Sequence, residues 1–123
     1  MLNRSLLIVR FKQPFLDWAV SLDDSGLVPE LGDETAYLVP EFDDEKEAER
    51  ILKRVYEEVF ERELTSWDTQ ESRWPKPRTL ALFREWFDIQ LHSMVEDLGD
   101  DALEDDGVGD YSLIFVKAHR YIR

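Results

Sequence analysis

Cysteine is absent from the 123 residues, which excludes disulfide bonds, thiolate zinc sites and cysteine nucleophiles. Long apolar runs are missing as well, since no stretch approaches the roughly 18 residues that a membrane span needs. The apolar run Leu6 to Val9 is too short for the core of a signal peptide. We therefore expect a soluble, cytoplasmic protein that makes no contact with membranes.

Positive charge is scarce: 15 Lys and Arg stand against 28 Asp and Glu, and the formal net charge is -13. A nucleic-acid-binding protein needs basic side chains to neutralise phosphates, and a protein that docks on anionic lipid needs them too. The composition argues against both classes. Hydrophobic residues make up 43% and aromatic residues 12%, which is enough for a folded core. The length fits one domain, residues 1–123.

Catalytic and nucleotide-binding motifs are also missing. The chain has no G-x-S-x-G elbow, no G-x-G-x-x-G loop, no phosphate-binding Lys after a glycine loop, and no H-E-x-x-H pair. We therefore assign no catalytic residue, no metal ligand and no cofactor. The absences favour a binding protein over an enzyme.

The apolar pattern predicts an α+β fold. A small mixed or antiparallel sheet has helices packed on one face, in the order β-α-β-α-α-β followed by a C-terminal segment. The expected strands cover residues 4–11, 35–40 and 87–95, and the expected helices begin at Pro14, span 43–64 and span 79–86. The near-continuous apolar character of residues 4–11 suggests that both faces of that strand are covered. In the helix 43–64, Asp44 with Glu47 three residues later resembles a capping box.

Residues 87–95 allow two interpretations. Apolar and polar side chains alternate from Phe87 to Val95, with Ser93 falling on the apolar face, and this is the period of a strand. Phe87, Leu91 and Leu98 also fall on one helical face. We favour a strand because the alternation runs through nine residues. The alternative is a helix that continues from residue 79.

Most of the charge excess is local. Residues 97–110 carry seven acidic side chains and no basic one, and residues 111–123 carry three basic side chains and no acidic one. We expect an acidic loop followed by a basic C-terminal segment. Within that segment, Leu113 to Val116 are apolar and β-prone. They form either the last strand of the domain sheet or an arm that joins two chains into a homodimer.

The segment 67–78 is the first candidate binding surface. It holds Trp67 and Trp74 with Arg73, Lys76 and Arg78 in an otherwise acidic chain. Trp and Arg are enriched at binding hot spots. The competing interpretation is that both indole rings fold back and cap the core beneath a long loop.

His92 is the second candidate. It stands among polar residues with Asp88 and Glu96 nearby in sequence. A histidine with carboxylates can act as a general base or bind a divalent metal, but only if the groups converge on one pocket. The ordinary alternative is a solvent-facing strand residue.

Taken together, these patterns predict a non-enzymatic, acidic binding or regulatory protein that contacts a basic protein partner. Its candidate binding residues are Trp67, Arg73, Trp74 and His92. Two alternatives remain open: a small enzyme or divalent-metal-binding protein centred on His92, and a homo-oligomeric structural module.

Overall fold

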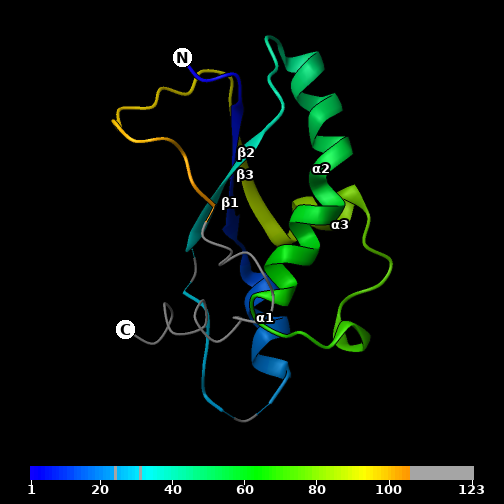
Figure 1. The fold of residues 1–123 in the computed structure, drawn as a ribbon. Coiled ribbons are helices and arrows are strands. Elements are labelled where there is room, and N and C mark those ends of the chain that lie inside the picture. The colour runs from blue at the N-terminus through cyan, green and yellow to red at the C-terminus, as the bar shows by residue number, and fades with distance from the viewer. Residues whose placement is uncertain (24, 31, 106–123) are drawn as a thin grey trace.

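The fold is an α+β arrangement with the predicted order of elements (Figure 1). A computed structural model describes residues 1–23, 25–30 and 32–105. The elements are β1 (Ser5–Phe11), α1 (Gln13–Ser21), β2 (Glu34–Val39), α2 (Glu45–Thr65), a 3-10 turn η1 (Glu71–Arg73), α3 (Leu80–Trp86) and β3 (Phe87–His92). The predicted C-terminal strand and basic segment, residues 111–123, lie outside the described residues.

The three strands form an antiparallel sheet in the order β2-β1-β3. In its register, Ile8 of the central strand lies between Ala36 of β2 and Gln90 of β3. Helices α2 and α3 lie on one side of the sheet, and α1 lies beyond its end (Figure 1). The prediction of a sheet with its helices on one face is therefore confirmed, and the sheet is antiparallel rather than mixed.

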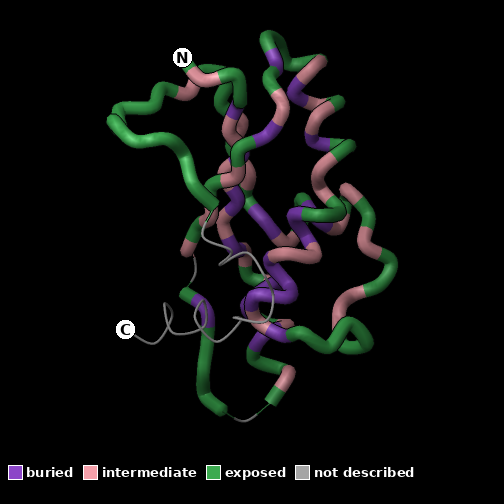
Figure 2. The backbone as a smooth tube through the Cα atoms, viewed as in Figure 1, coloured by how far each residue is buried: buried purple, intermediate pink, exposed green. Residues whose placement is uncertain are grey.

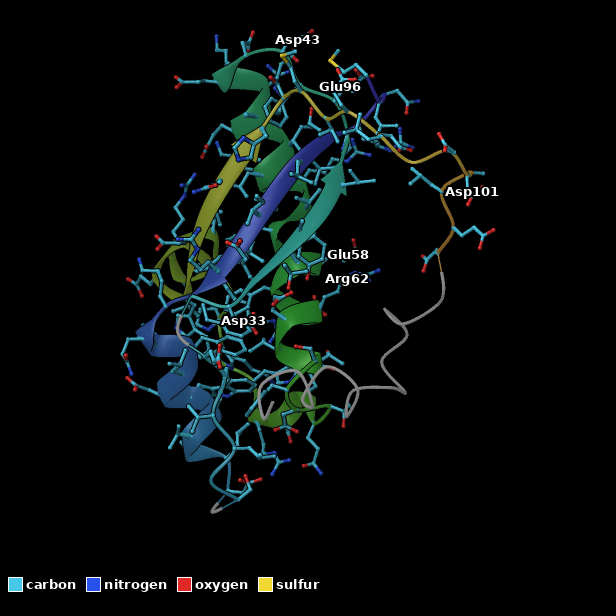
Figure 3. The ribbon with its side chains drawn as sticks, turned by 90° about the vertical axis from the view of Figure 1, so that its left-hand side faces the viewer. Asp33, Asp43, Glu58, Arg62, Glu96 and Asp101 are labelled. Atoms are coloured by element: carbon cyan, nitrogen blue, oxygen red, sulfur yellow. The ribbon has the colours of Figure 1, made fainter. Side chains whose placement is uncertain are left out.

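The two faces of β1 differ in burial. Ser5, Leu7, Val9 and Phe11 are buried, whereas the alternating residues between them are half-buried (Figure 2). We expected both faces of this strand to be covered; one face is buried beneath the helices and the other is half-buried, because the helices lie on one side of the sheet. We call the side that carries Leu6, Ile8 and Arg10 the open face.

Aromatic rings fill the core where β1 meets α1 and α3 meets β3. The rings of Phe11 and Phe15 stack with centroids 4.1 Å apart, and Phe87 lies 5.5 Å from Phe15. Phe60 of α2 meets Phe87 edge-on at 5.5 Å, so the cluster also holds the long helix. Such pairs add about 0.5–1.5 kcal/mol each beyond the burial of their area.

Helix α2 begins with the predicted capping box. The Asp44 carboxylate accepts a hydrogen bond from the Glu47 backbone N–H at 2.8 Å. The Glu47 side chain reaches back and accepts from the Asp43 backbone N–H at 3.0 Å. Two N–H groups that the helix itself cannot satisfy therefore have partners.

The structure confirms a strand, rather than a continued helix, from Phe87 onward. Helix α3, capped by the Thr79 hydroxyl, ends at Trp86, and β3 begins at the next residue. Phe87 pairs with Phe11 across the sheet, and the Lys12 backbone N–H donates to the Trp86 carbonyl at 2.9 Å. A strand is favoured over a longer helix because this register buries Phe87 among the other rings.

The Ser5 hydroxyl is a buried polar link at the other end of β1. It donates to the Ser93 carbonyl at 3.2 Å and accepts from the Phe42 backbone N–H at 3.1 Å. One side chain thus joins the central strand, the end of β3 and the segment before α2.

We predict that Asp44→Ala lowers the free energy of unfolding by about 1 kcal/mol, because the Glu47 N–H loses its acceptor. Urea denaturation measures the change. Asp44→Asn is the matched control, since it keeps the acceptor oxygen and should lose less. Equal losses in the two variants would contradict the capping role.

Candidate functional site

The 67–78 segment is organised around the buried carboxylate of Asp68. Its Oδ2 lies 2.7 Å from Arg73 Nε, and its Oδ1 accepts from Arg73 Nη2 at 2.9 Å and from the Gln70 backbone N–H at 3.0 Å. The hydrogen bond with Asp68 raises the pKa of Arg73. The carboxylate therefore closes the segment into a compact turn.

The indole N–H groups of two tryptophans fasten this turn. Trp74 Nε1 donates to the Asp68 carbonyl at 2.8 Å, and Trp18 Nε1 of α1 donates to the Arg73 carbonyl at 2.9 Å. Trp67 and Trp74 are both half-buried and pack against the core. Their placement fits the core-capping interpretation. Part of the Trp74 ring is still exposed, so a partner could contact it there.

Two charged residues border the turn. The Arg78 guanidinium lies 5.4 Å from the Trp74 ring centroid and 3.8 Å from Glu71 Oε1. Asp23, after α1, accepts a hydrogen bond from the Ser25 backbone N–H. The hydrogen bonds from Ser25, and to a smaller extent the charge of Arg73, lower the pKa of Asp23. The rim of the turn therefore carries fixed charges of both signs.

A groove lies between this turn and the outer side of α2. Its volume is about 630 Å³. The charged side chains that line it are four carboxylates and one guanidinium, and Trp74 supplies an aromatic wall: Glu57, Glu58, Glu61, Glu71, Arg54 and Trp74. We call it the α2 groove. Its lining favours a positively charged occupant.

A larger groove, about 860 Å³, lies at the start of α2 beside the end of β3. Two of its four carboxylates serve the fold: Asp44 caps the helix, and Glu49 holds Arg84 at 2.8 Å. No tryptophan lines this groove, so we place the candidate site in the α2 groove.

His92 is exposed on the open face at the end of β3. Its Nε2 lies 3.3 Å from Gln90 Oε1. Asp88 pairs with Arg10 at the other end of β3, and the Glu96 carboxylate lies 3.2 Å from the Met1 ammonium group. The structure therefore does not bring His92, Asp88 and Glu96 together. Within residues 1–105, where described, no three His, Asp or Glu side chains gather closely enough to hold a metal ion.

Glu63 is a residue that the sequence analysis did not single out. It is fully buried on α2, and its Oε2 accepts a hydrogen bond from the Tyr37 hydroxyl of β2. Its spacing held a signal, because Glu63 follows Val59 by four residues and Phe60 by three. It therefore shares their inward face. A carboxylate there needs hydrogen-bond donors, since burial of an unpaired charge is costly.

Comparisons of the chain with protein-family models, with curated proteins and with solved structures each found no match. Among the described helices, none has both the length and the apolar character to cross a membrane. The assignment of the candidate site therefore depends on the geometry and charge of the site alone.

We predict that Asp68→Ala destabilises the protein by about 1–3 kcal/mol, because Gln70 and Arg73 lose a charged acceptor. The exposure of Arg73 favours the lower end of that range. Asp68→Asn, which keeps one acceptor oxygen, should lose less. Chemical denaturation followed by tryptophan fluorescence measures both, and an unchanged midpoint in Asp68→Ala would contradict the role given to this carboxylate.

Tyr37→Phe should also cost about 1–3 kcal/mol, because it removes a donor from the buried Glu63 carboxylate. Tyr56→Phe is the matched control, since the ring of Tyr56 contacts Phe83 and keeps that contact without the hydroxyl. Thermal unfolding of the two variants compares them, and equal stability would count against a stabilising Tyr37–Glu63 bond.

Proposed function

We propose that the chain is a non-enzymatic binding protein whose α2 groove takes a basic, extended segment of a protein partner. The observation that carries the proposal is the lining of the groove, in which four carboxylates face one guanidinium beside an indole ring. The larger groove at the start of α2 has a similar excess of carboxylates, but no tryptophan lines it.

The charges support attraction of a basic partner. Glu57 and Glu58 of α2 are exposed, so their fields extend into solvent, and Glu58 shares its charge with Arg62 only loosely at 3.9 Å. Carboxylates of this kind raise association rates with basic partners and repel nucleic acid. Because the screening length is about 8 Å at physiological salt, the attraction acts mainly at short range.

The aromatic wall supports selection of arginine. The Trp74 ring is held by its N–H bond to the Asp68 carbonyl, and it already carries Arg78 over it at 5.4 Å. A guanidinium is attracted to an indole face by about 0.5–1 kcal/mol at exposed sites. A rigid ring loses little entropy when a ligand binds, so an incoming Arg side chain can use the remaining exposed surface.

The partner segment must be extended to suit this groove. The carboxylates at 57, 58 and 61 follow one side of α2, and Glu71 comes from the facing turn. A chain lying along the groove meets acidic groups on both sides. Tightly packed hydrophobic docking is not implied, because charged residues dominate the lining.

We predict that the double variant Glu57→Lys, Glu61→Lys weakens binding of a short peptide of alternating Arg and Ser by about tenfold. This factor corresponds to the loss of two exposed ion pairs and their replacement by repulsion. Isothermal titration calorimetry at low and physiological salt measures the affinity. Binding to the native chain should weaken as salt rises.

The matched control is Glu41→Lys, Glu85→Lys, which makes the same charge change at exposed positions outside the groove. It should retain most of the affinity. A peptide in which Glu replaces Arg should not bind. Equal losses in the two double variants, or affinity that ignores salt, would overturn the proposal.

A further inference from the structure

The charge on the exposed side of α2 changes sign within the α2 groove. Among the described residues that line the groove, Arg54 is the only basic one, and the helix carboxylates follow it at Glu57, Glu58 and Glu61. Residues three, four and seven positions apart share one side of a helix. With a rise of about 1.5 Å per residue, Arg54 lies about 10 Å before Glu61 along the helix axis. The groove therefore has a basic end and an acidic end.

The 67–78 turn lies beside the acidic end. It follows α2 directly, and the Asp68 backbone N–H donates to a carbonyl in the last turn of the helix at 2.8 Å. Trp74 is tied to the same point, because its indole N–H donates to the Asp68 carbonyl. Figure 1 shows the turn next to the C-terminal end of α2 and far from its start. Thr65, the last residue of α2, also lines the groove there, about 16 Å from Arg54 along the axis. The Trp74 wall and Arg54 are therefore at opposite ends of the groove.

The charge of Arg54 is available to a ligand. Its side chain is exposed, and among the residues that the structure describes, no carboxylate lies within ion-pair distance of its guanidinium. Glu58, four residues later, lies 3.9 Å from Arg62 instead. A helical pair in which the basic residue precedes the acidic one is also the weaker arrangement. The fold therefore leaves this guanidinium open to pairing with a carboxylate from a partner.

An extended segment spans the distance between the two ends. Side chains alternate between the two sides of an extended chain, and each residue advances the chain by about 3.3 Å. Residues i and i+4 therefore face the same side about 13 Å apart, with residue i+2 between them. This span falls between the lengths of about 10 Å and about 16 Å that separate Arg54 from Glu61 and from Thr65.

We propose that the occupant of the α2 groove is a segment of mixed charge, with an Asp or Glu that pairs with Arg54 and an Arg four residues away on the Trp74 wall. A basic residue midway between them lies opposite the helix carboxylates. Glu61 and Glu71 supply the negative charge around the Arg on Trp74. This inference rests on the proposed function and adds the order of charges in the partner. Arg54 thereby selects against a segment that is basic throughout.

The test compares three peptides with blocked ends that differ only at the position facing Arg54. They are Arg-Ser-Arg-Ser-Glu and the same peptide with Gln or with Arg in the last place. Each is also made in reverse order, because an extended segment can enter the groove in either direction, and the direction in which the Glu peptide binds more tightly is used. Isothermal titration calorimetry on the full chain measures the affinities.

We expect the Glu peptide to bind about threefold more tightly than the Gln peptide, which is the effect of one exposed ion pair. The Arg peptide should bind more weakly than the Gln peptide. The net charge of -13 alone predicts the opposite order, because a negative protein attracts the most basic peptide most strongly.

Arg54→Glu should reverse the order of affinities, so that the peptide ending in Arg binds most tightly. A role for Arg54 in stability alone would not exchange the preferred peptide. Lys46→Glu is the matched control, because it makes the same charge change at an exposed position of α2 outside the groove. It should keep the native order.

Four results would overturn the inference and leave the proposed function standing. They are equal affinities for the three peptides, tightest binding of the Arg peptide to the native chain, a preference for Glu that survives Arg54→Glu, and a reversal that Lys46→Glu also produces. Absence of binding by all three peptides would overturn the proposed function together with this inference.

Discussion

The packing of Phe11 against Phe15 and Phe87 is the interaction on which the other elements depend. Phe11 ends the central strand, Phe15 lies in the first turn of α1, and Phe87 joins α3 to β3, so one cluster of rings holds four elements together. Phe60 brings α2 onto the same cluster. The register of the sheet and the placement of the helices are thus set by the same buried surface. Groups farther from the cluster, such as the α2 groove, are positioned through it.

Acidic groups in this protein have distinct physical roles. Asp44 and Asp68 accept backbone hydrogen bonds, and Glu63 is buried with Tyr37. These carboxylates stabilise the fold and cannot serve a partner without a cost in stability. In the α2 groove, Glu57, Glu58 and Glu71 are exposed and Glu61 is half-buried, so these carboxylates can meet a cation from solvent. The net charge therefore says little about function until each carboxylate is placed.

Much of the fold follows from local patterns in the sequence. The cap at Asp44, the apolar stripe of α2 and the alternation after Phe87 each depend on neighbours in the chain, so they are visible without coordinates. The role of Asp68 in closing the 67–78 turn cannot be read from the sequence. Its contacts with the Gln70 backbone N–H and with Arg73 depend on the conformation of the backbone, and no sequence pattern marks this aspartate. The register of β3 is needed to show that His92 lies apart from Asp88 and Glu96. The α2 groove is formed by the 67–78 turn and α2 together. The periodicity of apolar residues describes one element at a time, so it does not predict the groove.

The direct junction of α3 and β3 also limits how the chain can vary. With no loop between Trp86 and Phe87, one inserted or deleted residue has no place to be absorbed. Because strand side chains alternate between faces, such a change would turn Ile89 and Leu91 outward and bring Asp88 and Gln90 toward the helices. Natural relatives of this protein should therefore differ in length elsewhere, in the connections before and after α2. The α3–β3 junction therefore fixes the register of β3 relative to α3.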